Sequence, residues 1–155
     1  MSSAVLVTGS SSGIGGAVVQ RLVRVPRLTV FASARRMSSI ADLGEAGARL
    51  LELDVTDEVS MRAAVDAVEA ARGAVGILVN NAGFGAYGTI EETDLDLVRG
   101  QFETNVFGLA RLTQLVLPGM RAAGGGRIVN IGSMGAGWRF RWRVRTTRPS
   151  MRWRR

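Results

Sequence analysis

Short apolar runs alternate with helical patterns along most of the chain, and this alternation restricts the fold more than any other feature of the sequence. The runs are short and continuous, as is typical of strands buried on both faces of a sheet. They cover residues 4–7, 28–34, 49–53, 75–79 and 127–131, and helical patterns lie between them over 13–25, 39–45, 57–72 and 94–120. Strands that alternate with helices form a parallel sheet with right-handed crossovers. We therefore predict an α/β fold with a doubly wound parallel sheet in three layers.

The positive charge of the chain is confined to its last 18 residues. Residues 1–137 contain 12 Arg and 13 acidic residues, a net charge of −1, whereas residues 138–155 contain eight Arg and no acid. All three tryptophans also lie in residues 138–155. We therefore divide the chain into one domain, residues 1–137, and an Arg/Trp-rich tail, residues 138–155, that looks foreign to it. The overall charge of +7 comes from the tail, and the domain itself is not basic. We therefore predict no nucleic-acid partner for the domain.

Cysteine and histidine are both absent. The chain can therefore form no disulfide bond and offers no thiolate or imidazole ligand, so we predict no metal site. There is no apolar run long enough to span a membrane, and the N-terminus lacks the features of a secretory signal. We expect a cytoplasmic protein without a membrane partner.

A glycine-rich segment follows the first predicted strand and reads Thr8-Gly9-Ser10-Ser11-Ser12-Gly13-Ile14-Gly15. Glycines let the backbone turn tightly and approach a pyrophosphate, whose charge is met by amides at a helix N-terminus. In isolation, the segment would fit a serine-capped turn equally well. Its position between a first strand and a helix favours dinucleotide binding. We expect Ile14, Val18, Leu22 and Val25 to form the buried face of that helix.

Four further segments stand at the ends of predicted strands or inside the last helix. They are Leu53-Asp54-Val55-Thr56-Asp57, Asn80-Asn81-Ala82-Gly83, Asn105-Val106-Phe107-Gly108 and Ile131-Gly132-Ser133. With the Gly-x-x-x-Gly-x-Gly spacing after the first strand, their order across residues 4–137 resembles the short-chain dehydrogenase/reductase family. The resemblance implies a Rossmann-like NAD(P)-binding domain, incomplete at its C-terminus. It also implies an oxidoreductase that interconverts alcohols and carbonyls by hydride transfer.

The same resemblance implies roles for individual residues. Ser133 would be catalytic and bond the substrate's carbonyl oxygen, where charge develops during hydride transfer. On the residues alone, Ser133 can also be a turn residue. The segment at Asp54 and Val55 would contact the adenine. The cofactor-binding residues implied or favoured at this point are Gly9, Ser11, Ser12, Gly13, Ile14, Gly15, Asp54, Val55, Asn81, Ala82 and Gly83.

Asn105 is unusual even without the resemblance. It interrupts an otherwise apolar stripe formed by Val98, Phe102, Leu109, Leu112 and Val116. A buried amide must be hydrogen-bonded or it destabilises the fold. Two interpretations stay open, and both can hold. Asn105 can be a structural residue at a helix distortion near Gly108, or, by resemblance, a catalytic residue that holds a water in the proton relay.

The segment after the second strand, residues 32–36, contains no acidic residue and ends in Arg35 and Arg36. An acid there would bond the ribose 2′-hydroxyl and repel a 2′-phosphate. Arg35 can instead pair with the phosphate through its planar guanidinium group. We therefore predict that Arg35 binds cofactor and that NADP is preferred to NAD. The alternative is that both arginines only solvate a loop.

The tail lacks the Tyr-x-x-x-Lys pair that the family places roughly a dozen residues beyond its serine. Hydride transfer to a carbonyl needs a proton donor. The chain has no lysine, and we expect Tyr87, its only tyrosine, to line the cleft rather than to act as an acid. We therefore predict an inactive product that is truncated or frame-shifted. Residues 139–155 can be back-translated with suitable codons into a nucleotide sequence. When that sequence is read one base earlier, it encodes Tyr-x-x-x-Lys, and the tyrosine codon straddles the codons of Arg145 and Thr146. The nucleotide sequence of the gene tests this hypothesis.

Two other functions stay open. The domain can be a non-catalytic NADP-binding module, or the Arg/Trp tail can bind nucleic acid or an anionic membrane. Because an out-of-frame tail explains the same composition, we expect neither a nucleic-acid nor a membrane partner. The expected partner is a small alcohol or carbonyl substrate of apolar character, since Phe84 and Tyr87 lie in the loop after the fourth strand. By resemblance, full-length relatives would be homo-oligomers.

Overall fold

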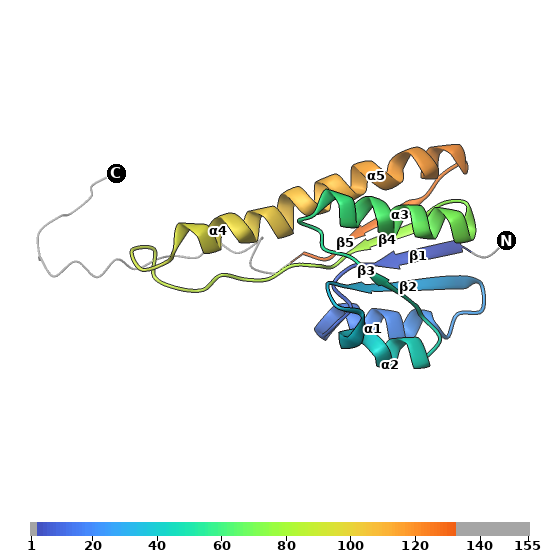
Figure 1. Cartoon of the computed structure of the whole chain (residues 1–155), viewed down its shortest axis with the longest axis horizontal. Coiled ribbons are helices and arrows are strands. Elements are labelled where there is room, and N and C mark those ends of the chain that lie inside the picture. Colours follow the sequence, from blue (N-terminus) through green and yellow to red (C-terminus); the bar gives the residue numbers. More distant parts are fainter. Residues whose placement is uncertain (1–2, 133–155) are drawn as a thin grey trace, which may run out of the picture.

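A computed structural model describes residues 3–132, which form a five-stranded parallel sheet with helices on both faces (Figure 1). The strands are β1 (Ser3–Val7), β2 (Leu28–Ala34), β3 (Arg49–Glu52), β4 (Ile77–Asn80) and β5 (Arg127–Asn130). Their order in the sheet is β3-β2-β1-β4-β5. In chain order, β2 and β3 therefore lie on one side of β1, and β4 and β5 lie on the other side. The predicted doubly wound α/β fold is confirmed, and each predicted strand lies within two residues of the observed one.

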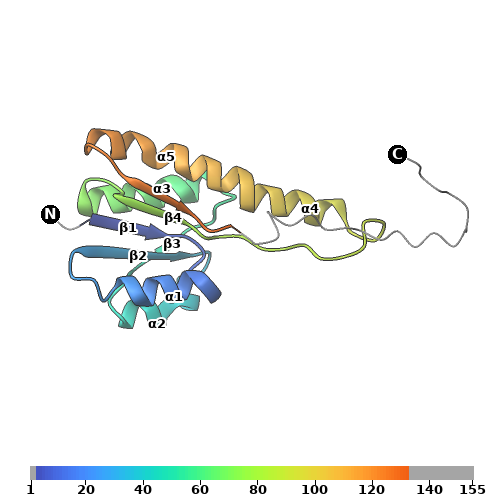
Figure 2. The ribbon, with the colours of Figure 1, turned by 180° about the vertical axis from the view of Figure 1, so that it is seen from behind.

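The helices form two layers around this sheet. They are α1 (Gly13–Leu22), the 3-10 helix η1 (Met37–Ile40), α2 (Ala41–Glu45), α3 (Glu58–Arg72), α4 (Leu95–Phe102), the π-helix η2 (Glu103–Gly108) and α5 (Leu109–Ala122). Figure 2 shows α1 and α2 on one side of the sheet, and α3 and α5 on the other. The helix expected over 94–120 is a continuous rod made of α4, η2 and α5. No helix of the described chain has the length and apolar character needed to cross a bilayer.

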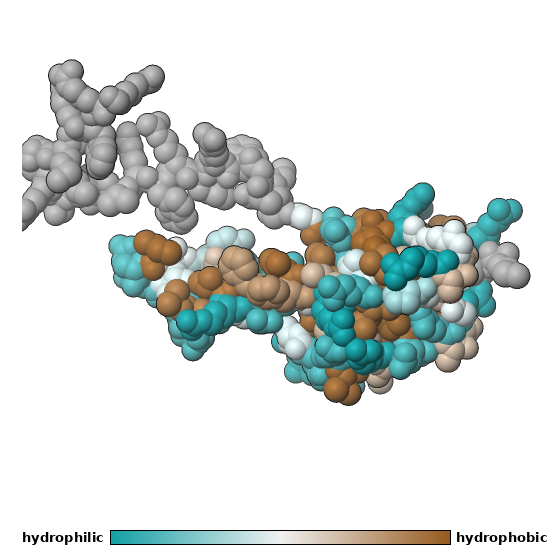
Figure 3. Space-filling view, turned by 90° about the horizontal axis from the view of Figure 1, so that it is seen from above, coloured by the Kyte–Doolittle hydropathy of each residue, from teal (hydrophilic) through white to brown (hydrophobic). Residues whose placement is uncertain are grey.

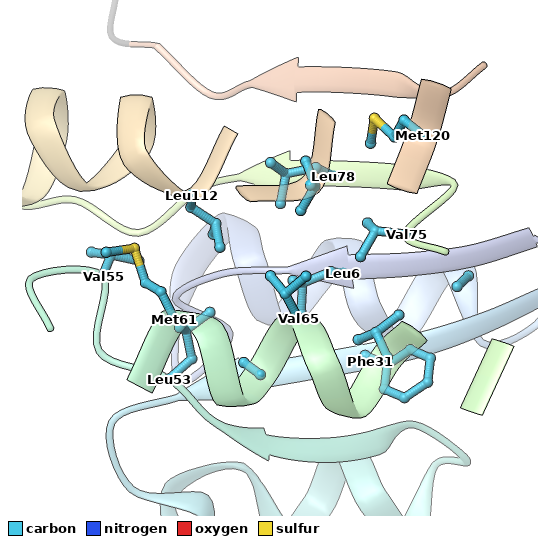
Figure 4. Close-up of a cluster of buried hydrophobic side chains, with 14 residues drawn as sticks. Leu6, Phe31, Leu53, Val55, Met61, Val65, Val75, Leu78, Leu112 and Met120 are labelled. Carbon is cyan, nitrogen blue, oxygen red and sulfur yellow. The ribbon is translucent and has the colours of Figure 1, made fainter. Parts of the chain in front are cut away.

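Two apolar clusters hold these layers together. Because side chains of a strand point alternately to its two faces, Leu6 of β1 packs in the cluster beneath α3 and α5, and Val5 packs in the cluster beneath α1 and α2. Figure 4 shows the first cluster, in which Leu6 and Leu78 from the sheet lie close to Val65 of α3. Burial on both faces explains why the central strands read as unbroken apolar runs.

The buried face of α1 agrees with the expected one only in part: Val18 and Leu22 are partly buried and pack against the cluster beneath α1 and α2, whereas Val25 is exposed. Ile14 is 59% exposed, and the fully buried positions are Gly15 and Val19. A Cβ atom at Gly15 would collide with the carbonyl oxygen of Gly9 and with the side chain of Asn81. The closest approach between α1 and the sheet edge is therefore made by a glycine, which an apolar pattern cannot reveal.

The rod also departs from the expected pattern at its N-terminal half. Leu112 and Val116 are fully buried, as expected, but Phe102 is 53% exposed and Asn105 is only partly buried. The reason is visible in Figures 1 and 2, where α4 and the segment before it extend beyond the edge at which the strands end. The sheet covers the stripe along α5 but cannot reach the part that belongs to α4.

Candidate cofactor-binding site

Two loops meet at the carboxyl ends of β1 and β4, and Thr8 joins them. Its Oγ1 accepts hydrogen bonds from the backbone N–H groups of Asn81 and Ala82, both at 2.9 Å. The same hydroxyl donates to the carbonyl of Val79 at 3.4 Å, and Thr8 is only 1% exposed. Thr8 therefore fixes the glycine-rich segment against the Asn-Asn-Ala-Gly segment, at the place where the direction of strand order changes.

Asn81 strengthens the same junction from the other side. Its Nδ2 donates to the carbonyls of Thr8 at 2.9 Å and Gly9 at 3.0 Å. Gly9 has a φ of 65°, and a Cβ atom there would lie 2.7 Å from the Cα atom of Ala82. Only glycine fits both the backbone conformation and the space. The structure thus brings Gly9, Asn81 and Ala82 together, as expected for residues of one site.

The N-terminus of α1 is left open. Ser12, its N-cap residue, makes no side-chain capping bond, and the first turn contains no acidic residue. In contrast, α3 and α4 are capped by the carboxylates of Asp57 and Asp94. The free N–H groups of a first turn and the positive end of a helix dipole favour an anion. Gly13, with a φ of 57° and no atom within 4 Å of its Cβ position, leaves the approach unobstructed.

The serines of the glycine-rich segment divide into two kinds. The Ser10 hydroxyl turns inward and donates to the carbonyl of Val7 at 3.1 Å, whereas Ser11 and Ser12 are exposed beside the open helix end. A concave region of about 290 Å³ lies next to them. Its lining comes from the loop, from the first turns of α1 and from the η1–α2 segment, which contributes Ser39 and Asp42.

β2 is tied to the same loop and presents two arginines at its end. The buried Ser33 donates its hydroxyl to the carbonyl of Val7 at 3.0 Å, and its own carbonyl accepts the Ser10 N–H at 2.9 Å. Arg35 and Arg36 follow directly and are exposed. Arg35 forms no ion pair within residues 3–132. Arg35 therefore follows a strand that is bonded to the glycine-rich loop, and its guanidinium group has no ion-pair partner among the described residues.

The segment after β3 makes its contacts within a local turn and with the apolar core. The Asp54 carboxylate accepts bonds from the Thr56 N–H at 2.9 Å and from its hydroxyl at 2.8 Å. Val55 is 7% exposed and belongs to the cluster under α3 and α5. Its carbonyl also lies against Gly108, where a Cβ atom would have no room. Asp54 and Val55 are therefore placed by a turn and by packing against the rod.

Asn105 lies within the π-helix η2 and holds the loop that follows Gly83. Its Oδ1 accepts the Phe84 N–H at 3.1 Å, and its Nδ2 donates to the Phe84 carbonyl at 2.8 Å. Both ends of the amide are thus used by the backbone of one residue. The structural interpretation of Asn105, at a helix distortion near Gly108, is confirmed. π-Helical turns are frequent at functional sites because they redirect a few groups within an otherwise regular helix.

Other expected site residues lie elsewhere. Ser133 and the tail fall outside the described residues, and β5 ends just before them, with the Ile131 N–H donating to the Asn80 carbonyl at 2.9 Å. Tyr87 is 94% exposed, so within the described chain it does not line a cleft. It lies in the segment between β4 and α4, beyond the end of the sheet.

Three polar residues hold the site together in roles that the sequence did not predict, although two of them, Thr8 and Asn80, stand inside the quoted motifs. Thr8 and Ser33 are two of them. The third is Asn80, whose Nδ2 donates to Thr113 at 3.1 Å and to Asn130 at 2.9 Å, so that it ties β4 to α5 and β5. The available signal was the same for all three residues, a polar side chain within or at the end of a strand that is otherwise apolar.

Comparisons with known proteins agree with this geometry. The family model described as short chain dehydrogenase matches residues 3–144. The 3-ketodihydrosphingosine reductase of Bacteroides thetaiotaomicron is 37% identical over 131 residues, which are 84% of this chain and 47% of the relative. Human 17-beta-hydroxysteroid dehydrogenase type 1 is 38% identical over 142 residues, 84% of this chain and 43% of the relative.

Solved structures show the same similarity. A short-chain dehydrogenase from Streptomyces avermitilis has a TM-score of 0.83 at 42% identity, over 90% of this chain and 52% of its own. An actinorhodin polyketide ketoreductase variant solved with NADPH has a TM-score of 0.81 at 39% identity, over 88% and 55%. The chain spans about half the length of the curated relatives it matches. It belongs to the short-chain dehydrogenase/reductase family of NAD(P)-dependent oxidoreductases.

Proposed function

We propose that residues 3–132 bind the adenosine and pyrophosphate portions of a dinucleotide at the carboxyl edge of the sheet. The observation that carries the proposal is the open N-terminus of α1, which no side chain caps. The loop in front of it is held in place by hydrogen bonds among Thr8, Gly9 and Asn81. We therefore expect the backbone of this loop to change little when a ligand binds. A pyrophosphate would accept bonds from the free N–H groups near Gly13.

We propose NADP as the preferred form of the cofactor. Arg35 follows β2 directly, is exposed and has no ion-pair partner in the described chain. No acidic residue occurs in the segment 32–36 to bond a ribose 2′-hydroxyl. A guanidinium group there would pair with a 2′-phosphate through charge-assisted hydrogen bonds. The solved relative with NADPH supports this choice by analogy.

For the reaction, we propose alcohol and carbonyl interconversion as the ancestral activity and no turnover by this chain. The cofactor supplies the hydride when bound. Ser133 would donate a hydrogen bond to the substrate's carbonyl oxygen. A proton donor for the resulting alkoxide is missing, because the chain has no lysine and its only tyrosine, Tyr87, lies on the exposed segment beyond the sheet. The expected behaviour is that of a module that binds NADP(H) without catalysis.

Calorimetric titration of the full chain with NADP⁺ and NAD⁺ tests the cofactor preference. Arg35→Ala should weaken NADP⁺ binding about tenfold, the loss expected for one exposed charge-assisted contact, and leave NAD⁺ binding unchanged. Arg36→Ala is the matched control, since it removes the same charge one residue away. Equal losses for both cofactors, or equal effects of the two substitutions, would contradict the assigned role of Arg35.

A further inference from the structure

The surface of the described chain differs in character from one part of the molecule to another. Figure 3 shows hydrophobic residues along the segment that projects beyond the sheet. The concave region of about 290 Å³ beside α1 is instead lined mainly by serines and glycines. Asp42 is the only charged residue among the described residues that line it. An acid at a place proposed to receive phosphate groups needs a physical explanation.

One wall of this concave region favours an anion. It is formed by the glycine-rich loop and the first turns of α1, where Ser11 and Ser12 are exposed and no side chain caps the helix. The free N–H groups of the first turn and the positive end of the α1 dipole therefore lie at this wall. A phosphate group on this side would be stabilised.

The second wall has the reverse character. It is formed by η1 and α2, from which Ser39 and Asp42 line the region. The hydroxyl of Ser39 already donates a hydrogen bond to the carbonyl of Arg36 at 2.6 Å. Asp42 is exposed and forms no ion pair with any residue of the described chain. This wall therefore presents a negative charge that no neighbouring cation compensates.

Buried neighbours hold Asp42 in its place. Ile40 is 0% exposed, Leu43 is 2% exposed, and both pack in the apolar cluster beneath α1 and α2. Because the backbone is anchored on both sides of Asp42 and the aspartate side chain is short, its carboxylate stays close to the region. A volume of about 290 Å³ corresponds to a sphere about 8 Å across, which is comparable to the Debye length of about 8 Å at physiological ionic strength. The charge of Asp42 therefore acts on an anion that enters.

The order of the elements indicates which part of a dinucleotide would meet this charge. In a sheet of this type the ribose 2′ position lies at the end of the second strand, and the pyrophosphate lies at the N-terminus of the first helix. Here η1 begins at Met37, directly after Arg36, so the second wall continues from the end of β2. A 2′-phosphate would therefore approach Asp42 more closely than would a pyrophosphate bound near Gly13.

We propose that Asp42 is a specificity-determining residue that repels the 2′-phosphate of NADP and limits the preference for NADP that Arg35 provides. This inference rests on the proposed dinucleotide site. NAD has no 2′-phosphate, so the repulsion falls mainly on NADP. Two unit charges about 8 Å apart in water change an affinity about twofold, and a 2′-phosphate with nearly two negative charges raises this effect to about fivefold. The ratio of the two affinities is then set by a cation at Arg35 and an anion at Asp42.

Calorimetric titration of the full chain at low salt tests this role. Asp42→Asn should tighten NADP⁺ binding about fivefold and NAD⁺ binding less than about twofold. Asp42→Lys reverses the charge and should tighten NADP⁺ binding about 25-fold, the square of the effect of neutralisation. Asp66→Asn and Asp66→Lys are the matched controls, because Asp66 is exposed on α3, on the other side of the sheet (Figure 2). They should change the ratio of the two affinities less than about twofold.

The possible results separate this inference from the proposed function. Equal gains for NADP⁺ and NAD⁺ would overturn the inference, because the acid would then act on the pyrophosphate. Equal effects of the Asp42 and Asp66 substitutions would also overturn it, because net charge alone would explain them. If the wild-type chain bound neither cofactor, the proposed function would fail together with the inference. If it bound both, and Asp42→Asn left the ratio of affinities unchanged, the inference alone would fail.

Two isomeric probes give an independent measurement. Adenosine 2′-monophosphate and adenosine 5′-monophosphate carry the same charge and differ only in the position of the phosphate. Amide shifts of the ¹⁵N-labelled chain should show that Asp42→Asn tightens binding of the 2′ isomer more than binding of the 5′ isomer. This difference should disappear in 1 M salt, where the Debye length is about 3 Å. Equal gains for both isomers, or a difference that persists in 1 M salt, would contradict an electrostatic role of Asp42 at the 2′ position.

Discussion

Single polar side chains connect segments that are far apart in the sequence, and these contacts define the site. The hydroxyl of Thr8 bonds backbone groups 73 and 74 residues away, and Asn81 returns two bonds to Thr8 and Gly9. The sequence predicts that Gly9 and Asn81 share one site, because both follow strands of a parallel sheet. It could not predict which atoms bond, because those partners are set by the order and register of the strands.

Removing the Thr8 hydroxyl should cost much more than removing an exposed one. Thr8→Val keeps the shape of the side chain but leaves two backbone N–H groups without their acceptor in a buried position. We expect a loss of about 2–3 kcal/mol in the free energy of unfolding, measured with urea. Thr56→Val removes an exposed hydroxyl that bonds Asp54 and should cost less than about 1 kcal/mol. Equal losses would contradict the role assigned to Thr8.

At the scale of elements, apolar runs identify the strands well, because those strands are buried on both faces. The same reasoning fails where glycine makes the closest contact. Gly15 orients α1, and Gly108 allows η2 to approach the carbonyl of Val55. It fails again along α4, where a helical apolar pattern continues past the end of the sheet. Periodicity shows that a face is apolar, but only the tertiary structure shows whether anything covers that face.

Two glycines of the same rod should respond oppositely to substitution by alanine. A Cβ atom at Gly108 would collide with the carbonyl of Val55, so Gly108→Ala should destabilise the fold by about 1–3 kcal/mol. At Gly100 the nearest atom outside the helix is the Cζ of Phe84 at 4.0 Å. Gly100→Ala should therefore stabilise the helix by up to about 1 kcal/mol. Urea unfolding measures both changes, and a loss at Gly100 as large as at Gly108 would rule out the steric explanation.

Glu58 links α3 to α5 and makes that contact dependent on pH. Hydrogen bonds from Arg111 and Arg62 lower the pKa of Glu58 from 4.5 to about 2. A carboxyl whose pKa is lower in the folded chain contributes stability above its unfolded pKa and loses that contribution as the pH falls through its folded pKa. The contribution should therefore be complete near neutral pH and disappear between about pH 5 and pH 2.

The matched variants Glu58→Gln and Glu45→Gln test this dependence by urea unfolding across that range. Glu58→Gln should lower the unfolding midpoint at pH 7 and approach the wild-type value near pH 2. Glu45→Gln should show no such convergence, since Glu45 forms no ion pair in the described chain. A constant difference for Glu58→Gln at all pH values would show that the ion pairs with Arg62 and Arg111 are not its source.

On the scale of the whole molecule, the chain shares with its relatives a fold that accounts for about half of their length. The glycine-rich loop, the end of β2 and the Asn-Asn-Ala-Gly loop converge at one edge, and these are the elements expected to hold a dinucleotide. The sequence predicted this convergence and the family. It also located the break in composition that separates the domain from its Arg/Trp tail.

The claim that a dinucleotide binds at the open N-terminus of α1 is tested most directly by the backbone amide resonances of the full ¹⁵N-labelled chain during titration with NADP⁺. We expect saturable shifts that are largest at Ser12, Gly13 and Ile14, with smaller ones at Arg35. If NADP⁺ produced no saturable shift at these amides, or shifted only residues of the Arg-rich tail, the proposed site would be wrong.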